Sequence, residues 1–185
     1  MQDEELLRRI ASGAESALNT LMERHGARFL SFFDRYLGDR AGAEDLVVEL
    51  FVRIWRNAGR FDAERGKATS WMFRIASNLA ASAVRSRTRR IYREAGVDPE
   101  WPSRNGALSG DPLETLARAE SAAKLRTALG ALPETIRAVV LLRHFHDLSF
   151  AEVGEALDIP TGTAKSRMHR GLLLLRNELQ PEATP

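Results

Sequence analysis

Residues 149–175 read SFAEVGEALDIPTGTAKSRMHRGLLLL, and this stretch decides the fold class because its pattern is that of a helix-turn-helix. The motif needs two short helices that cross closely, with apolar residues at the inward positions and a small residue at the crossing. Gly154 is the small residue, and Asp158 occupies the turn, where Asp tolerates left-handed backbone geometry better than most residues. The inward apolar positions are Val153, Leu157, Ile159, Ala164 and Met168. The stretch therefore predicts one helix at 149–157 and a second at 161–179.

Four polar residues near the start of the second helix form one exposed stripe that contains no carboxylate. A recognition helix meets base edges in the major groove at this end. Arg167 lies beside the stripe, where it can reach a phosphate, and Thr163 belongs to the helix start. The residues predicted to read duplex DNA are Thr163, Lys165, Ser166, Arg167, His169 and Arg170. Any amphipathic surface helix can carry Lys and Arg, but the intact turn spacing favours DNA contact.

Proline and glycine divide the chain into two helical regions. No proline occurs from residue 4 to residue 93, whereas residues 94–112 contain three prolines, three glycines and little periodicity. That composition is typical of a linker. The chain is therefore predicted to be all-α, with small helical domains at 1–93 and 113–185 joined by a flexible linker at 94–112.

Helical periodicity and local signals set the expected helix bounds. Helices are predicted at 3–12, 14–37, 41–58 and 68–92 before the linker, and at 112–130, 133–146, 149–157 and 161–179 after it. Pro133 suits a first helical turn, where its missing N–H costs nothing. Ser149 and Glu152 form a capping box at the start of the helix-turn-helix.

Composition excludes several classes of protein. Of the 185 residues, 44% are hydrophobic and 28% are charged, which is ordinary for a globular protein. Cysteine is absent, which excludes disulfides and thiolate metal sites and fits a reducing compartment. The acidic N-terminus does not resemble a secretory signal, and no apolar run is long enough to span a bilayer. We therefore expect a soluble cytoplasmic protein without membrane insertion.

The predicted helix at 41–58 has an apolar face and a mixed face. The apolar face, which should pack in the core, consists of Leu46, Val47, Leu50, Phe51 and Ile54. The mixed face combines charges with two valines, and consists of Asp45, Val48, Glu49, Val52, Arg53 and Arg56. A mixed apolar and charged patch suits a protein partner, although scattered surface valines are also common in proteins without one.

The predicted helix at 68–92 indicates nucleic-acid binding. Its inward stripe is Met72, Ile75, Ala76, Leu79 and Ala83. Its opposite side carries Trp71, Arg74, Asn78, Ser82 and Arg85. Residues 85–93 then contain five arginines and no carboxylate, which is a phosphate-binding pattern. An aromatic side chain beside such a patch can stack on an unpaired base. Alternatively, Trp71 belongs to the core and the arginines form a solvated tail.

Several segments resemble the extracytoplasmic-function (ECF) group of the sigma-70 family of bacterial RNA polymerase sigma factors, which keeps the second and fourth sigma domains. GDRAGAEDLV at 38–47 and FVRIW at 51–55 resemble the polymerase-binding helix. WMFRIASN at 71–78 resembles the helix that engages the −10 promoter element. The domain that reads the −35 element is resembled by LPE at 132–134, LSFAEV at 148–153 and GTAKSRMHR at 162–170. The order and spacing of these segments make the resemblance specific.

The resemblance implies a transcription initiation factor that binds core RNA polymerase and promoter DNA and is commonly held inactive by an anti-sigma factor. Asp45, Glu49, Arg53 and Arg56 would bind the clamp helices of the polymerase largest subunit, with Val48 and Val52 completing the polymerase-binding face. The duplex-reading helix would bind the −35 element.

For the −10 element, the resemblance implies capture of a melted strand. Asn78 and the loop at 60–67 would hold an extruded base, while Trp71 and Arg74 would support strand opening. The predicted −10 residues are Arg60, Phe61, Arg65, Lys67, Trp71, Arg74, Asn78, Ser82, Arg85, Arg87, Arg89 and Arg90.

Two other classes of protein compete with this interpretation. A stand-alone helix-turn-helix regulator that binds operator DNA without polymerase would explain the motif but not the surfaces before the linker, and no dimerisation heptad is visible. An enzyme is less favoured because His25, His144, His146 and His169 lack metal-ligand spacing and no nucleophile motif occurs. No catalytic residue, metal or cofactor is therefore expected.

Overall fold

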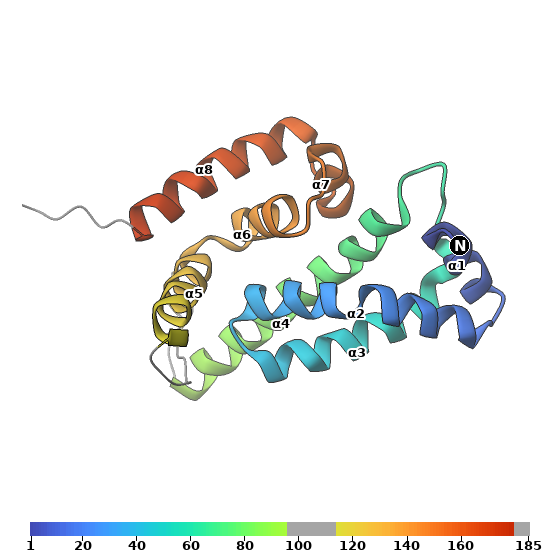
Figure 1. Cartoon of the computed structure of the whole chain (residues 1–185), viewed down its shortest axis with the longest axis horizontal. Coiled ribbons are helices and arrows are strands. Elements are labelled where there is room, and N and C mark those ends of the chain that lie inside the picture. The colour runs from blue at the N-terminus through green and yellow to red at the C-terminus, as the bar shows by residue number, and fades with distance from the viewer. Residues whose placement is uncertain (96–113, 180–185) are drawn as a thin grey trace, which may run out of the picture.

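The computed structural model describes residues 1–95 and 114–179, and every regular element in them is helical (Figure 1). An N-terminal bundle contains α1 (Asp3–Ala11), α2 (Glu15–Leu37), α3 (Arg40–Asn57), a 3-10 turn η1 (Ala58–Arg60) and α4 (Ala68–Ala95). A C-terminal bundle contains α5 (Glu114–Ala131), α6 (Glu134–Val140), a π-helical turn η2 (Leu141–Phe145), α7 (Phe150–Leu157) and α8 (Thr161–Leu179). The all-α prediction is confirmed. Residues 96–112 of the predicted linker lie outside the described residues. Throughout the two described ranges, each helix is too short or too polar to span a bilayer.

Short-range signals explain several helix ends. Gly38 follows α2 with a positive φ of 65°, and Asp39 caps α3 by accepting a hydrogen bond from the Gly42 N–H at 3.2 Å. The Ser149 hydroxyl accepts from the Glu152 N–H at 3.2 Å, and the Glu152 carboxylate accepts from the Ser149 N–H at 2.8 Å. The predicted capping box at the start of α7 is therefore confirmed.

The helix-turn-helix has the close crossing that its sequence predicts. Asp158 adopts left-handed geometry between α7 and α8, with φ of 54°. A Cβ at Gly154 would lie 2.8 Å from the carbonyl oxygen of Ile159, so a larger residue does not fit there. Further along α8, a Cβ at Gly171 would lie 2.5 Å from a methyl group of Val140 on α6. Both approaches bring helix backbones together and hold α8 against α6 and α7.

The helix predicted at 133–146 differs from the observed one at both ends. Pro133 precedes α6 as its N-cap residue, with ψ of 140°, instead of lying in the first turn. Its carbonyl oxygen still accepts the first hydrogen bonds of the helix. Regular α-helix ends at Val140, and η2 continues the coil to Phe145. A π-helical turn adds one residue to the coil, so the side chains after it point in a different direction than the 3.6-residue period predicts.

Most of the predicted inward positions are confirmed. The buried ones are Leu50, Phe51, Ile54, Met72, Ala76, Leu79, Val153 and Ala164. The remainder are half-buried, namely Leu46, Val47, Ile75, Ala83, Leu157, Ile159 and Met168.

An aromatic cluster forms the centre of the N-terminal bundle. The Phe29 ring centroid lies 4.9 Å from that of Phe73 and 6.1 Å from that of Phe51, so α2, α3 and α4 meet there. All three side chains are buried, and tilted or edge-to-face aromatic pairs add specific geometry to the apolar packing. The cluster therefore fixes α3 and α4, which carry two of the three predicted surfaces, relative to each other.

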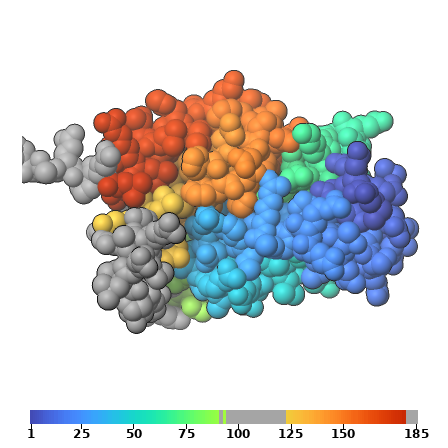
Figure 2. Space-filling view, in the orientation of Figure 1, coloured from blue at the N-terminus to red at the C-terminus, as the bar shows by residue number. Residues whose placement is uncertain are grey.

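The two bundles pack directly against each other. In the space-filling view, the α6 and α7 region (orange) rests on α2 (blue) without a visible gap (Figure 2). Helix α7 contacts α4, while α5 and η2 contact α2. Buried apolar residues of both bundles belong to one continuous core. The C-terminal bundle therefore covers part of the surface of the N-terminal bundle.

Candidate polymerase and nucleic-acid interfaces

The mixed face of α3 lies on the outside of the N-terminal bundle. We call it the α3 face, and it consists of Asp45, Val48, Glu49, Val52, Arg53 and Arg56. Val48 is 65% exposed and Val52 is 37% exposed, so both valines face solvent as expected. Arg53 Nε donates to Glu49 Oε1 at 2.7 Å, one turn apart on the helix. The α3 face is therefore an exposed apolar patch with a charged rim.

The loop between α3 and α4 and the first turns of α4 line a cavity of about 300 Å³. The predicted −10 residues that line it are Arg60, Phe61, Arg65, Lys67, Trp71 and Arg74, which we call the α4 face. Trp71 is half-buried, and its ring packs edge to face on Phe61, with centroids 5.7 Å apart. Asn78 and Ser82 lie one and two turns further along α4, exposed, and do not line the cavity. The cavity thus combines cations with an aromatic wall.

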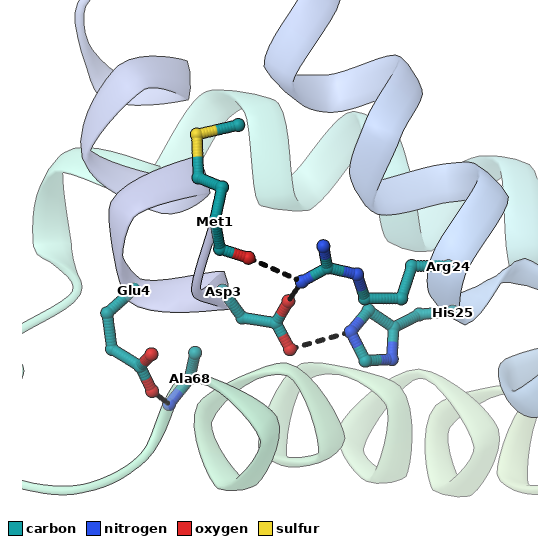
Figure 3. Close-up of polar contacts among 6 residues, drawn as sticks. All are labelled: Met1, Asp3, Glu4, Arg24, His25 and Ala68. Carbon is teal, nitrogen blue, oxygen red and sulfur yellow. Dashed lines mark hydrogen bonds and ion pairs between the residues drawn. The ribbon is translucent and has the colours of Figure 1, made fainter.

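Helix α1 supports this cavity from outside (Figure 3). Glu4 Oε1 accepts a hydrogen bond from the N–H of Ala68, the first residue of α4, at 3.1 Å. A carboxylate at a helix N-terminus satisfies an otherwise unpaired N–H and complements the positive end of the helix dipole. Asp3 Oδ2 lies 2.7 Å from His25 Nε2, and Arg24 also contacts Asp3, which ties α1 to α2. Helix α1 therefore fixes the start of α4 relative to α2.

The predicted arginine run lies at the other end of α4, about 28 Å of helix away from Trp71. Its members Arg85, Arg87, Arg89 and Arg90 are all exposed. Arg85 is 3.8 Å from the Glu134 carboxylate, and Arg87 is 3.8 Å from the Asp39 carboxylate. Arg87 and Arg90 line a second cavity, of about 500 Å³, beside α2 and α5. The structure therefore separates the predicted −10 residues into two groups.

Helix α7 packs against the α4 face. Arg74 donates two hydrogen bonds to the Glu155 carbonyl oxygen, from Nε at 3.0 Å and from Nη2 at 2.6 Å. Lys67 Nζ lies 2.8 Å from Glu152 Oε1. The hydrogen bond from Lys67 is the main reason that the pKa of Glu152 falls to about 2, and the same bond raises the pKa of Lys67. Two cations of the α4 face are therefore engaged by the other bundle.

A buried histidine forms a second contact between the bundles. His146, which follows η2, is 4% exposed, and its ring centroid lies 5.7 Å from that of Phe32 and 5.2 Å from that of Phe73. Its Nε2 is buried and has no hydrogen-bond partner in the described parts of the chain. Burial, with Arg28 and Arg35 nearby, lowers the pKa of His146 to about 4. His146 is therefore neutral at pH 7 and packs as an aromatic ring.

A buried arginine forms a third contact. Arg137 is 6% exposed, and its Nη1 donates to the Tyr36 carbonyl oxygen at 2.9 Å. Its Nη2 donates to the Leu132 carbonyl oxygen at 3.0 Å, within the C-terminal bundle. Burial raises the pKa of Tyr36 to about 12, so its hydroxyl stays protonated. Arg137 thus links α6 to the end of α2.

The predicted duplex-reading residues lie together on α8, on the side of the C-terminal bundle away from α2 and α3 (Figure 1). We call four of them the α8 stripe, namely Lys165, Ser166, His169 and Arg170, and all four are exposed. Thr163 and Arg167 flank the stripe and are half-buried, and the Ser166 hydroxyl donates to the Thr163 carbonyl oxygen at 3.0 Å. The α8 stripe is therefore open to solvent, in contrast to the α4 face.

The residues that join the two bundles were not among the predicted sites. Glu152 was expected to cap α7 only, and Glu155 and Arg137 had no expected role. A signal was present in the charge pattern, since Glu152, Glu155 and Asp158 make α7 acidic while the loop at 60–67 is basic. For Arg137 no sequence signal is apparent.

Comparison with known protein families and sequences matches both bundles. The family model described as Sigma-70 region 2 matches residues 21–90, and the model described as Sigma-70, region 4 matches residues 122–175. The ECF RNA polymerase sigma factor SigW of Bacillus subtilis is 30% identical over 178 residues, which cover 94% of this chain and 95% of SigW. The ECF RNA polymerase sigma factor SigE of Mycolicibacterium smegmatis is 34% identical over 172 residues, which cover 91% of this chain and 65% of SigE.

Solved structures share the fold. CnrH, in complex with the cytosolic domain of CnrY, superposes with a TM-score of 0.71 at 24% identity, covering 98% of this chain and 99% of CnrH. The sigma factor RpoE from Bartonella quintana, in complex with the anti-sigma factor NepR, gives a TM-score of 0.67 at 22% identity, covering 88% of this chain and 96% of RpoE. The predicted resemblance is confirmed by the match to SigW over nearly the whole of both chains. The chain belongs to the ECF group of the sigma-70 family of RNA polymerase sigma factors.

Proposed function

We propose that this sigma factor binds core RNA polymerase through the α3 face and directs it to specific promoters, reading the −35 element as duplex and the −10 element as melted strand. In this proposal residues 1–93 act on polymerase and the −10 element, and residues 113–185 act on the −35 element. Residues 94–112 form the linker between them.

The observation that carries the proposal is the exposed α8 stripe. Lys165 and Arg170 are cations near the N-terminal end of the second helix of a helix-turn-helix, where such helices contact base edges. Ser166 and His169 add hydrogen-bonding groups that can read bases, and Arg167 can reach a phosphate. The stripe contains no carboxylate that would repel DNA.

The α4 face supports capture of a melted strand. Trp71 and Phe61 offer aromatic surface for base stacking, and the surrounding cations suit the phosphates of a single strand. Asn78 supplies an amide donor and acceptor further along the same helix. In the proposal the exposed arginines from Arg85 to Arg90 hold the DNA backbone without reading its sequence.

The α3 face supports docking on polymerase. Its exposed valines and charged rim have the composition of a protein interface. By resemblance to the family, its partner is the pair of clamp helices in the largest subunit. An anti-sigma factor is a second proposed partner, because the relative RpoE was solved in complex with the anti-sigma factor NepR.

In vitro transcription tests this proposal directly. The chain is mixed with core polymerase and a library of random duplex DNA, and the start sites of the transcripts are sequenced. A shared −35 and −10 pattern is expected only when the chain is present. Transcription that selects no start sites would contradict the proposal, and so would tight operator binding by the free chain without polymerase.

A pair of matched variants locates the polymerase contact. Val48→Asp places a charge in the apolar centre of the α3 face and should reduce selected transcripts by roughly tenfold or more. Met22→Asp is the control, since Met22 is also an exposed apolar residue, at 41%, but lies on α2 outside the proposed interface. Equal losses for both variants would show that the α3 face is not the docking site.

A further inference from the structure

Helix α7 meets the α4 face with complementary charge and geometry. Both terminal groups that would bind a phosphate on this face, the Lys67 ammonium and the Arg74 guanidinium, already have acceptors on α7. Lys67 pairs with the Glu152 carboxylate, and Arg74 uses two of its nitrogens on a single carbonyl oxygen. These donors cannot serve DNA phosphates and α7 at the same time.

Carboxylates of α7 also form part of the wall of the cavity. Glu155 and Asp158 line it together with the cations and Trp71 of the α4 face. The fit reaches the loop backbone, since a Cβ at Gly66 would lie 2.8 Å from Glu155 Oε2. A nucleotide in this cavity would bring its phosphate next to these two carboxylates, which repel it. The closed cavity therefore disfavours the anion that the open α4 face would bind.

The contacts differ in how readily they exchange. The Lys67 side chain is 71% exposed, and such pairs are weak and screened by salt, so phosphate can replace the carboxylate. The contacts of His146 and Arg137 are buried and keep the C-terminal bundle close to the N-terminal bundle. Because α7 belongs to the same chain, it meets the α4 face at a high effective concentration.

From these contacts we propose that the acidic side of α7 is an interaction surface whose partner is the α4 face of the same chain, so that α7 competes with single-stranded DNA for that face. The inference rests on the proposed function, because it assigns regulation to the −10 surface. The free sigma factor then presents its −35 surface on α8 while its −10 surface is occupied. Docking on polymerase must separate α7 from α4 before a melted strand can be captured.

Variants on the C-terminal bundle test this without altering the α4 face. Glu152→Gln combined with Glu155→Gln removes both carboxylates, and Gln at 152 can still complete the capping box. His146→Asp places a charge between Phe32 and Phe73 and should separate the bundles. His146→Phe should hold them together, because it replaces a buried nitrogen that lacks a partner.

A charge-matched control separates competition from general electrostatics. Glu15→Gln combined with Glu23→Gln removes the same number of carboxylates from exposed positions on α2. Any DNA-affinity change shared with this control reflects net charge alone. The full chain is used throughout.

Two measurements report the competition. Because the chain has no cysteine, dyes can be attached to cysteines introduced at Asn19 on α2 and Asn177 on α8, and energy transfer between them reports the separation of the bundles. Fluorescence anisotropy with a short random single-stranded DNA reports binding to the α4 face, and a random duplex serves as the second probe. The opening variants should lower energy transfer and raise single-strand affinity by roughly tenfold, if about one chain in ten is open in the wild type. Duplex affinity should change no more than in the control, and His146→Phe should lower single-strand affinity.

Several results would overturn the proposal. One is an opened chain whose single-strand affinity matches that of the wild type. Another is wild-type energy transfer as low as in His146→Asp, because α7 would then not occupy the α4 face. Energy transfer that appears only between chains labelled separately would place the contact between two copies. Failure of the proposed function is distinct, since it would appear as no selected transcription with core polymerase for any variant, whatever the binding data show.

Discussion

The α4 face and the α8 stripe are both cationic surfaces carried by helices, and both are proposed to bind promoter DNA. The α8 stripe is exposed along its whole length, on a helix whose packing partners lie on its other side. The α4 face instead meets α7, with Lys67 and Arg74 bonded to acceptors there. The difference shows that a surface suited to DNA in sequence is not necessarily available in the folded chain. Availability depends on contacts between residues that are far apart in sequence.

The largest expected effect comes from pH, acting on the contact that keeps the α4 face covered. The pKa of His146 falls from 6.5 to about 4 in the packed bundles, because its ring is buried and Arg28 and Arg35 of α2 are near. The remaining faces of the ring meet Phe32 of α2 and Phe73 of α4. Separation of the bundles exposes the ring and restores an ordinary pKa, so the separated state binds the proton more readily. The packed state should therefore be fully favoured above about pH 6.5 and should lose on the order of 3 kcal/mol as pH falls to about 4.

This pH dependence can be measured as the radius of gyration in solution scattering or as energy transfer between the labelled bundles. Glu152 does not contribute in this range, because its pKa of about 2 keeps it charged. His146→Gln cannot gain a proton and should remove the transition. An identical transition in that variant would show that another group controls the packing.

The next effect separates the two surfaces by mutation. Lys165→Ala on the α8 stripe should weaken binding to a selected −35 duplex by on the order of 1–3 kcal/mol and leave the packing of the bundles unchanged. Arg176→Ala, an exposed cation further along α8, is the control and should have little effect. Binding titrations at one fixed salt concentration compare the two. Unchanged affinity and preference in Lys165→Ala would remove the stripe from DNA recognition.

A third prediction concerns the packing that presents the α8 stripe. Gly171→Ala would place a methyl group 2.5 Å from Val140 and 2.9 Å from Ile136, which should destabilise the C-terminal bundle by about 1–3 kcal/mol. Gly162→Ala is the matched control, because a Cβ at Gly162 has open space around it. Chemical denaturation of both variants gives the difference. Equal stability of the two would mean that α6 shifts to accommodate the methyl group.

The smallest effect concerns the support of the α4 face. Glu4→Ala removes the acceptor for the Ala68 N–H and should cost about 0.5–2 kcal/mol, as other lost helix caps do. Glu5→Ala is the control, because Glu5 pairs only with Arg8 within α1 at the surface. Hydrogen exchange at the first turn of α4 should rise in Glu4→Ala and not in the control. Unchanged protection there would indicate that water replaces the carboxylate without loosening the turn.

Local features of the fold were predictable because they depend on neighbours in sequence. The capping box of Ser149 and Glu152, the left-handed turn at Asp158 and the close crossing at Gly154 all follow from residue type and spacing. The exposure of Val48 and Val52 also follows, since helical periodicity places them opposite the buried side of α3. Pro133 was misplaced by one position because the same fixed φ suits an N-cap residue and the first helical residue.

The packing of the two bundles was not predictable from the sequence, for a physical reason. Arg28, Arg74 and Arg137 cross between the bundles, and each donates to a backbone carbonyl oxygen. Every residue has such an oxygen, so the acceptors carry no sequence signature. The donors resemble ordinary surface arginines until the fold brings them to their partners. The site was therefore recognisable from its residue types, but its occupancy was not.

The π-helical turn η2 makes the docking of the bundles a matter of helical register. Deleting one residue between Leu141 and Phe145 would restore an ordinary α-helix there and rotate everything after it by about 100°. Ile136 and Val140, which precede the turn, would keep their places against α8. His146 would swing away from Phe32 and Phe73. A one-residue deletion could thus uncouple the two halves of the molecule while leaving each half intact.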